Sequence, residues 1–191
     1  MGRLRIMSHN VWKNDKNLPA WAAKGEDCSA AVRAKGMVRI YAETQPDIIG
    51  FQEMSPTMVD EILLGLTSQD QRYALLWGRD TPILYRQDRF ELLDSDFFLY
   101  STELPGWAGE FNNSGTKSWC IAVFRDKTDG KKLAFMSTHL WWKSSDPASP
   151  DYQPGSDEAR VYQLNLAMDR LEQFHAQYDC PAVLVGDLNA A

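Results

Sequence analysis

The stretch PAVLVGDLN, residues 181–189, contains the pattern from which the fold is predicted. Its apolar run, residues 182–185, is followed by Gly186, which is typical of a short buried strand. Asp187 and Asn189 come next, on alternate positions. The sequence therefore predicts a buried strand that delivers two polar side chains at its tip.

Three other polar side chains share this placement at or near the end of an apolar strand. Asn10 follows LRIMSH, Glu53 follows DIIGFQ, and His139 follows LAFMST. Each alone has an ordinary structural explanation as a turn residue, a partner of a helix dipole or a half-buried histidine. A sheet that delivers several such side chains to one rim can assemble a metal and phosphate site. Their combination favours a functional site.

Helical periodicity predicts helices over residues 29–44, 56–66 and 156–178, and the last has an apolar stripe that includes Val161 and Met168. Strand-like stretches cover residues 4–11, 47–51, 73–77, 82–85, 90–100, 119–125 and 132–140. The pair Asp129-Gly130 predicts a hairpin between the last two. Because helices and strands mix without strict alternation, we expect a layered α/β or α+β sandwich on largely antiparallel sheets.

The composition is that of an ordinary globular protein. Of 191 residues, 44% are hydrophobic and 24% charged, which suffices for one sizeable core, so we expect a single domain over residues 1–191. The net charge of -6 argues against a protein held to nucleic acid by bulk electrostatics, because that affinity requires Lys and Arg to neutralise phosphates. A nucleic-acid substrate would need local contacts.

Cysteine usage and the N-terminus indicate the compartment. Three scattered cysteines without a C-x-x-C pair argue against a disulfide framework or a zinc site. The N-terminus lacks the apolar stretch of a signal peptide, and no run reaches the length of about 18 apolar residues of a membrane span. We expect a cytoplasmic protein without a membrane segment, and a signal peptide that has been removed is the alternative left open.

Five motifs carry a family resemblance. SHNVW (residues 8–12), DIIGFQE (47–53), ILYRQDRFELLDS (83–95), MSTHLWW (136–142) and VLVGDLN (183–189) resemble the endonuclease/exonuclease/phosphatase superfamily in order and spacing. The resemblance implies a four-layer α/β/β/α sandwich of the deoxyribonuclease-like type. It also implies a hydrolase of phosphoester bonds that uses a divalent metal, Mg²⁺ or Mn²⁺.

The resemblance also implies roles for single residues. Glu53 matches the family's metal-ligating glutamate, and Asn10 matches the asparagine beside it that positions metal-bound water or phosphate. Oxygen ligands of this kind suit a hard cation. Asp187 matches the aspartate that orients and deprotonates the attacking water, and Asn189 is its companion. His139 matches the histidine that binds the phosphate and stabilises charge in the transition state.

Two further residues match the family. Tyr85 matches a donor of a hydrogen bond to phosphate, and Arg160 matches a residue that holds the site residues in place without contacting the substrate. The family normally continues past Gly-Asp-x-Asn to a Ser-Asp-His or similar motif, which this sequence lacks. We therefore expect a chain truncated at the C-terminus, without the last strands of the fold and impaired when alone. Self-association through exposed sheet edges is expected for such a chain.

The substrate is a phosphoester, with nucleic acid and nucleotides among the candidates, and a phosphodiesterase or nuclease is the leading prediction. The alternatives are a phosphomonoesterase, a lipid phosphodiesterase, or a catalytically silent interaction module. Trp12, Trp141 and Trp142 adjoin the proposed site residues. They either stack on a base or sugar or pack the core and rim.

Overall fold

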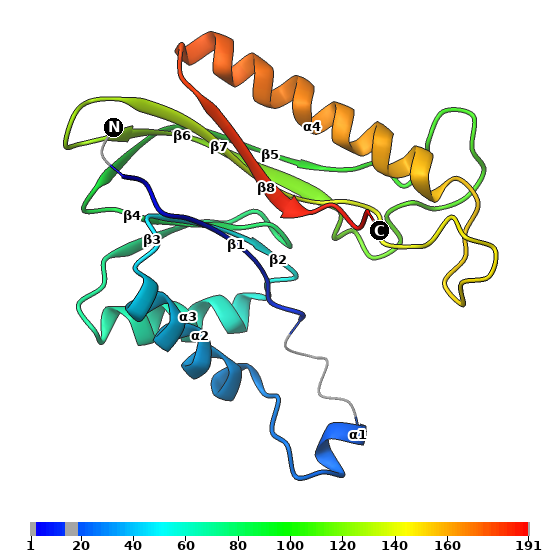
Figure 1. Ribbon diagram of the computed structural model, residues 1–191, viewed down its shortest axis with the longest axis horizontal. Coiled ribbons are helices and arrows are strands. Elements are labelled where there is room, and N and C mark those ends of the chain that lie inside the picture. The colour runs from blue at the N-terminus through cyan, green and yellow to red at the C-terminus, as the bar shows by residue number, and fades with distance from the viewer. Residues whose placement is uncertain (1–2, 14–18, 191) are drawn as a thin grey trace.

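The computed structural model describes residues 3–13 and 19–190 and shows two sheets packed face to face between helices. Figure 1 shows the layers in order: α2 and α3, the first sheet, the second sheet, and α4. The helices are α1 (Pro19–Ala22), α2 (Ala30–Thr44), α3 (Pro56–Thr67) and α4 (Ser156–Tyr178). The strands are β1 (Ile6–Asn10), β2 (Ile48–Gln52), β3 (Tyr73–Leu76), β4 (Ile83–Arg86), β5 (Phe90–Leu99), β6 (Ser118–Asp126), β7 (Lys132–His139) and β8 (Ala182–Asp187). The predicted four-layer α/β/β/α sandwich is confirmed.

The first sheet has the strand order β1-β2-β4-β3, with β1 parallel to β2 and the other pairs antiparallel. Every residue of β2 is buried, because α2 and α3 cover one face and the second sheet covers the other. Helix α3 begins where the Ser55 hydroxyl accepts a hydrogen bond from the Met58 amide and Pro56 takes the first turn. This start fixes the direction of the chain directly after Glu53.

The second sheet has the order β5-β6-β7-β8, with β7 parallel to β8 and the other pairs antiparallel. The predicted hairpin joins β6 to β7, and Gly130 takes the positive φ of +73° that its turn needs. Helix α4 has the predicted bounds, but its apolar stripe was wrong in part. Val161 and Met168 are exposed, and the buried face of the helix instead runs through Ala159, Gln163, Ala167, Leu171 and Phe174.

The two sheets share a dry core that lies between them. Ile48 and Ile83 of the first sheet pack with Phe124 and Phe135 of the second, and all four are fully buried. Gly50 of β2 marks a close approach of the sheets, since a Cβ there would lie 2.5 Å from Val185 Cγ2. The strand ends that carry the polar residues are therefore held at a fixed separation.

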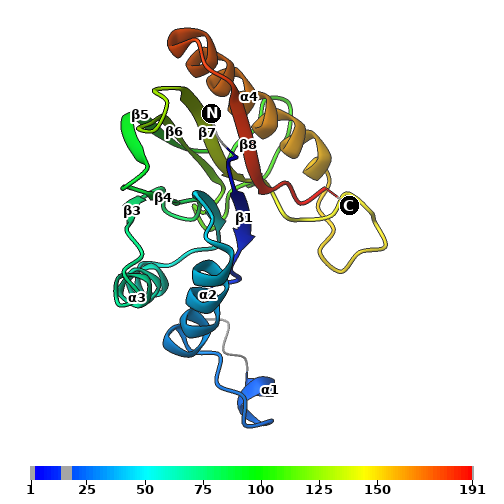
Figure 2. The ribbon, with the colours of Figure 1, turned by 60° about the vertical axis from the view of Figure 1, so that its left-hand side comes forward.

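Helix α1 is the one described helix that the sequence pattern did not predict, and it projects away from the layers (Figures 1 and 2). The two long polar segments before β6 and before α4 form loops at the same end of the molecule as the tips of β7 and β8. Among residues 3–13 and 19–190, no helix combines the length and apolar character needed to cross a membrane.

Candidate active site

The predicted polar residues come together where four strands end. Asn10 is the last residue of β1 and Glu53 follows β2, and these two strands are parallel neighbours. His139 and Asp187 are the last residues of β7 and β8, and they are partners in the parallel register of those strands. Strands β1 and β8 lie in contact across the two sheets, as Figure 2 shows. Both sheets therefore contribute to one polar rim.

Asn10 links the two carboxylates at this rim. Its side-chain nitrogen donates to Glu53 Oε1 at 3.2 Å and to Asp187 Oδ2 at 2.8 Å. Its side-chain oxygen accepts from the Trp12 amide at 2.9 Å, which fixes the orientation of the amide group. Asn189 holds Asp187 from the other side, because its backbone amide donates to Asp187 Oδ1 at 3.0 Å. Both oxygens of Asp187 are thus positioned by hydrogen bonds.

The backbone at the rim is unusual. Trp12, Glu53 and Asn189 follow β1, β2 and β8, and each has a positive φ, at +46°, +59° and +50°. This region is uncommon for residues other than glycine and costs conformational energy. The surrounding hydrogen bonds maintain the strained backbone, which turns the Glu53 and Asn189 side chains toward the rim. Such strain is typical of functional sites.

His139 belongs to a buried chain of three polar residues. Its Nδ1 lies 2.6 Å from Asp80 Oδ2, and its Nε2 lies 2.6 Å from the Lys117 ammonium nitrogen. A protonated lysine donates and cannot accept, so with Lys117 charged Nε2 is the acceptor and Nδ1 donates to Asp80. All three side chains are almost fully buried. Asp80, His139 and Lys117 therefore stand in line beside Asp187, whose Oδ2 lies 3.9 Å from His139 Nε2.

Burial lowers the pKa of Lys117 to about 8, and the nearby carboxylates of Asp80, Glu53 and Asp187 oppose that effect. The ammonium form is favoured by these negative charges and disfavoured by the loss of water. Lys117 is therefore protonated at neutral pH but close to its titration range. It is a cation without a full hydration shell, which strengthens its attraction for an anion.

A cavity of about 330 Å³ lies in front of these residues. Glu53, Lys117, His139 and Asn189 line it, together with the half-exposed indole of Trp142. Of the other two tryptophans beside the site, Trp141 is fully buried in a small core of its own, and Trp12 is exposed near Arg33. Trp142 alone of the three borders the cavity.

Helix α4 supports the loop after His139. Arg160 donates through Nη1 to the carbonyl oxygens of Trp141 and Lys143, at 3.3 and 2.7 Å. Gln163, which is fully buried, accepts a 2.8 Å hydrogen bond from the Trp141 amide. Arg160 thus holds the loop that follows His139, and its role in support of the site stays a prediction.

The structure does not bring Tyr85 to this group. In the antiparallel register of β2 with β4, Tyr85 lies opposite Ile48 at the start of β2, whereas Glu53 follows the end of β2. The Tyr85 ring packs on Phe124, with 4.7 Å between ring centroids, and burial raises the pKa of its hydroxyl. The tyrosine therefore serves the core between the sheets, and a phosphate contact from this position is not supported.

Asp80 and Lys117 were missed because the sequence analysis considered only residues that follow strands. Asp80 precedes β4 and Lys117 immediately precedes β6, and both strands run antiparallel to a strand that ends at the rim. In an antiparallel pair, one strand starts where the other ends. Charged residues just before strands 82–85 and 119–125 were the signal that could have found them.

The donor set at the rim fits a hard divalent cation that retains water. Among the described residues, no three His, Cys, Asp or Glu side chains gather into a closed metal cage. Glu53 and Asp187 nevertheless lie within hydrogen-bond reach of one Asn10 nitrogen. Mg²⁺ is commonly held by one or two carboxylates plus substrate oxygens and waters. In this orientation the Asn10 oxygen is engaged by Trp12, so Glu53 is the better placed ligand of the predicted pair.

A two-sheet sandwich with carboxylates, a histidine and a lysine at one rim defines a class of protein. The chain belongs to the Endonuclease/Exonuclease/phosphatase family, whose model matches residues 7–191. A comparison with curated proteins gives no match. The predicted family is therefore confirmed, and solved structures provide the closer comparison.

Three solved structures are similar to this chain. A family member from Bacteroides thetaiotaomicron is 19% identical, with a TM-score of 0.73, and the match covers 97% of this chain and 63% of that chain. The mannosyl-6-phosphatase Bt3783 from Bacteroides thetaiotaomicron VPI-5482 is 20% identical, with a TM-score of 0.72 and coverage of 98% and 66%. TDP2 from D. rerio, complexed with a single-stranded DNA product, is 22% identical, with a TM-score of 0.65 and coverage of 100% and 62%.

These likenesses concern the fold. The identities lie between 19% and 22%, and this chain spans less than two thirds of the length of each of the three structures. The mannosyl-6-phosphatase activity and the bound single-stranded DNA product belong to those proteins. Substrate and mechanism for this chain rest on its own residues.

Proposed function

We propose that this chain hydrolyses a phosphoester bond by attack of water that Asp187 orients and deprotonates. The observation that carries the proposal is the Asn10 amide, which joins Glu53 and Asp187 beside the Asp80–His139–Lys117 chain. Glu53 and Lys117 line the cavity, Asp187 lies beside it, and two carboxylates with a cation are what hydrolysis of a phosphoester needs. One group binds a metal, one activates water, and one neutralises the phosphate.

Asp187 is suited to act as a general base. Its side chain keeps 31% of its exposure, so water reaches it, while Asn10 and the Asn189 backbone hold its two oxygens. A base fixed in this way is already oriented toward the attacking water. General-base catalysis by a positioned side chain contributes about 10²- to 10⁴-fold to the rate. Asn189 also donates through its side chain to the Leu140 carbonyl at 3.0 Å, so it ties the base to the strand that carries His139.

Glu53, with Asn10 and Asp187 near it, would hold the divalent cation, Mg²⁺ or Mn²⁺. When bound, such a cation withdraws charge from the phosphoryl group and orients it. The hydrogen bond from Asn10 places the Glu53 carboxylate at the rim, and the left-handed backbone there is of the kind found at functional sites, which supports this role.

Lys117 supplies the positive charge that faces the phosphate. One of its three N–H bonds is used on His139, and the ammonium group still lines the cavity. Asp80 holds the ring proton of His139, so His139 presents a lone pair that keeps Lys117 in place. In this arrangement His139 positions Lys117 as well as bordering the substrate. Charge stabilisation by a fixed donor is worth about 10²- to 10³-fold in rate.

The substrate favoured by the structure is a small phosphoester. The chain is acidic overall, and the cavity is bounded by the loop residue Ser114 and by Trp142. A long polyanion needs a line of phosphate-neutralising cations, whereas a single phosphate needs one. The intact Asp187, Glu53 and Lys117 argue against a silent interaction module.

The test is a turnover assay on the full chain with p-nitrophenyl phosphate, bis(p-nitrophenyl) phosphate and a single-stranded oligonucleotide. We expect hydrolysis of the small esters with Mg²⁺ or Mn²⁺, slow because the chain is expected to be impaired when alone, and loss of that activity with EDTA. Activity that persists in EDTA would exclude the cation, and cleavage of the oligonucleotide alone would favour the nuclease. No turnover of any of the three substrates under any condition would contradict the proposed function.

A further inference from the structure

A second cavity, of about 380 Å³, adjoins the one in front of His139. The two share four lining residues: Lys13, Asp80, Ser114 and Thr116. A ligand whose phosphate lies beside Lys117 therefore has room to extend past Asp80 into this space. Its volume lies in the range of about 300–1,000 Å³ that is usual for small-molecule sites.

The segment between β3 and β4 builds one wall of this cavity. Gly78 packs directly on β6 of the other sheet, since a Cβ there would lie 2.6 Å from Cys120 Cβ. Arg79 has a positive φ of +52°. The close contact and the left-handed turn hold the loop tightly, so Trp77 and Arg79 on either side of Gly78 project outward. Trp77 remains 42% exposed although it directly follows a strand.

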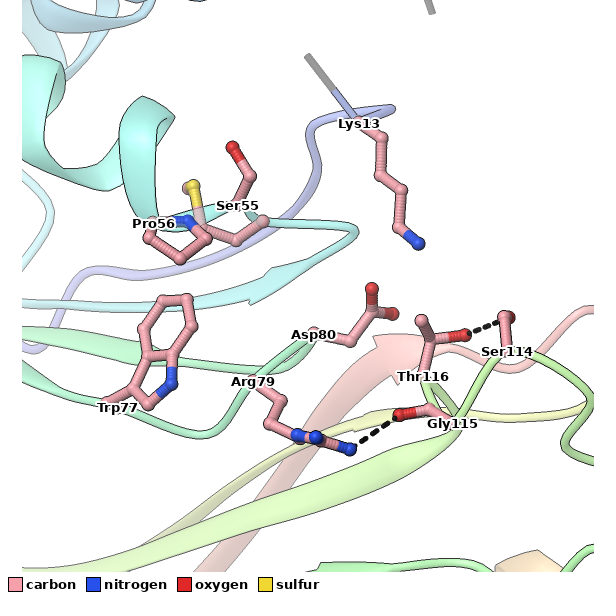
Figure 3. A pocket seen from close by; sticks show the side chains of 10 residues that line it. Lys13, Ser55, Pro56, Trp77, Arg79, Asp80, Ser114, Gly115 and Thr116 are labelled. Atoms are coloured by element: carbon pink, nitrogen blue, oxygen red, sulfur yellow. Dashed lines mark hydrogen bonds between the residues drawn. The ribbon is translucent and has the colours of Figure 1, made fainter. Parts of the chain in front are cut away.

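The two sides of the cavity differ in character. Figure 3 shows the Trp77 indole and the Pro56 ring on one side and Lys13, Ser114 and Thr116 on the other. Asp80 lies between them, and Arg79 crosses below to donate to the Gly115 carbonyl at 3.3 Å. One side offers an aromatic face, and the other offers hydroxyl groups and cations.

We propose that this second cavity binds the alcohol part of the substrate, a single ring unit of the size of one sugar or one nucleoside. The proposal rests on the proposed function, because it places the ester's phosphate beside Lys117. The face of Trp77 stacks on the ring, and Lys13, Arg79 and Thr116 bind its polar substituents. Trp77 and Arg79 are therefore specificity-determining residues and take no part in the bond cleavage.

The chemistry of the lining favours this occupant over a purely apolar one. An indole face binds the planar face of a base or the C–H face of a sugar, and neither has to lose its polar edge contacts. Lys13 and Arg79 suit the hydroxyl, carbonyl or anionic groups that such a ring carries. An aliphatic group would leave the polar side without partners, which costs affinity.

Binding titrations test this assignment. They use the full chain with Mg²⁺ and the Asp187→Asn change, so that no probe is consumed. The probes are adenosine 5′-monophosphate, glucose 6-phosphate and ethyl phosphate, which has no ring. Trp77→Ala is compared with Trp107→Ala, a matched control, because Trp107 is 39% exposed and lines a separate cavity.

We expect at least one ring-bearing probe to bind about tenfold more tightly than ethyl phosphate. Trp77→Ala should remove that preference and leave ethyl phosphate binding unchanged, while Trp107→Ala should retain the preference. Which probe is preferred separates a nucleoside from a sugar. Arg79→Met, on the exposed polar side, should also weaken the ring-bearing probe, and it keeps the test decisive if Trp77→Ala does not fold.

Equal binding of all three probes, or a ring preference that survives both Trp77→Ala and Arg79→Met, would overturn the assignment. A single-stranded oligonucleotide that binds more tightly than both ring probes and loses this advantage in Trp77→Ala would replace it with a nucleic-acid groove. Because binding is measured without turnover, the two proposals fail separately. A ring preference without hydrolysis by the unmodified chain rejects the proposed function alone.

Discussion

The side-chain nitrogen of Asn10 lies 2.8 Å from Oδ2 of Asp187, although 177 positions separate the two residues along the chain. One residue ends an edge strand of the first sheet, and the other ends an edge strand of the second. The proposed base is thus positioned by a residue of the opposite sheet. The packing of the two sheets therefore decides whether the site forms.

Replacement of Asn10 by Asp tests the charge balance at the rim. The change places a third carboxylate beside Glu53 and Asp187, so repulsion should lower stability by about 1–2 kcal/mol, or a melting temperature by roughly 2–8 °C. A divalent cation should reduce this difference, because it binds the added charge. Thermal unfolding with and without Mg²⁺ measures both effects. A loss of stability that is the same in EDTA and in Mg²⁺ would contradict a cation site here.

Gly50→Ala tests the close approach of the sheets. The new methyl group would meet Val185 and Ser137 at 2.5 and 3.0 Å, and we expect overpacking to cost about 1–3 kcal/mol in the free energy of unfolding. Gly36→Ala is the control, because nothing lies within 4 Å of a Cβ added in the middle of α2. That change should stabilise the protein by about 0.4–1 kcal/mol. Urea unfolding of both variants gives the comparison.

Lys117 predicts the alkaline limit of activity. The charged form exists below its pKa of about 8, so phosphate binding should weaken as the pH rises through that value. Lys117→Arg keeps a guanidinium charged in this range, so the fall in kcat/KM should move to higher pH even if the maximum is lower. Lys117→Met should bind phosphate weakly and show a low kcat/KM at every pH. An unchanged alkaline limb in Lys117→Arg would remove Lys117 from the account.

Asp80→Asn tests the other end of the hydrogen-bonded series Asp80–His139–Lys117. The negative charge of Asp80 favours the ammonium form of Lys117, so its removal should lower the pKa of Lys117 further. The alkaline fall of kcat/KM should then move to lower pH. Asp88→Asn, which alters an exposed pair with Arg86, should leave the profile unchanged. Identical profiles in the two variants would show that Asp80 has no electrostatic effect on Lys117.

Local sequence patterns predicted the helices and strands well, because the bounds of a helix or a turn depend on neighbouring residues. Helix α4 has the predicted bounds, and the Asp129-Gly130 turn forms the predicted hairpin. The apolar stripe of α4 failed at Val161 and Met168, because the face that packs on the sheet runs through Ala159, Gln163, Ala167, Leu171 and Phe174. Size complementarity between layers is a property of the packed fold that periodicity does not record.

The site was predictable where polar residues end strands, as Asp187 and His139 do. Asp80 and Lys117 could not be predicted, because their position depends on which strands run antiparallel. Trp77 could not be predicted, because nothing in the neighbouring sequence indicates that its side chain is exposed. Tyr85 was assigned from a motif alone, and the register placed it at the other end of the sheet. Topology, more than residue type, decided the cases of Asp80, Lys117 and Tyr85.

The most direct measurement compares kcat of Asp187→Asn with that of Asp169→Asn on a small phosphoester at saturating Mg²⁺. Asp169 is an exposed acid on α4 and serves as the matched control. The account predicts a loss of about 10²- to 10⁴-fold for Asp187→Asn, with an unchanged melting temperature, and no loss for Asp169→Asn. Equal turnover by the two variants would show that Asp187 is not the base and would contradict the central claim.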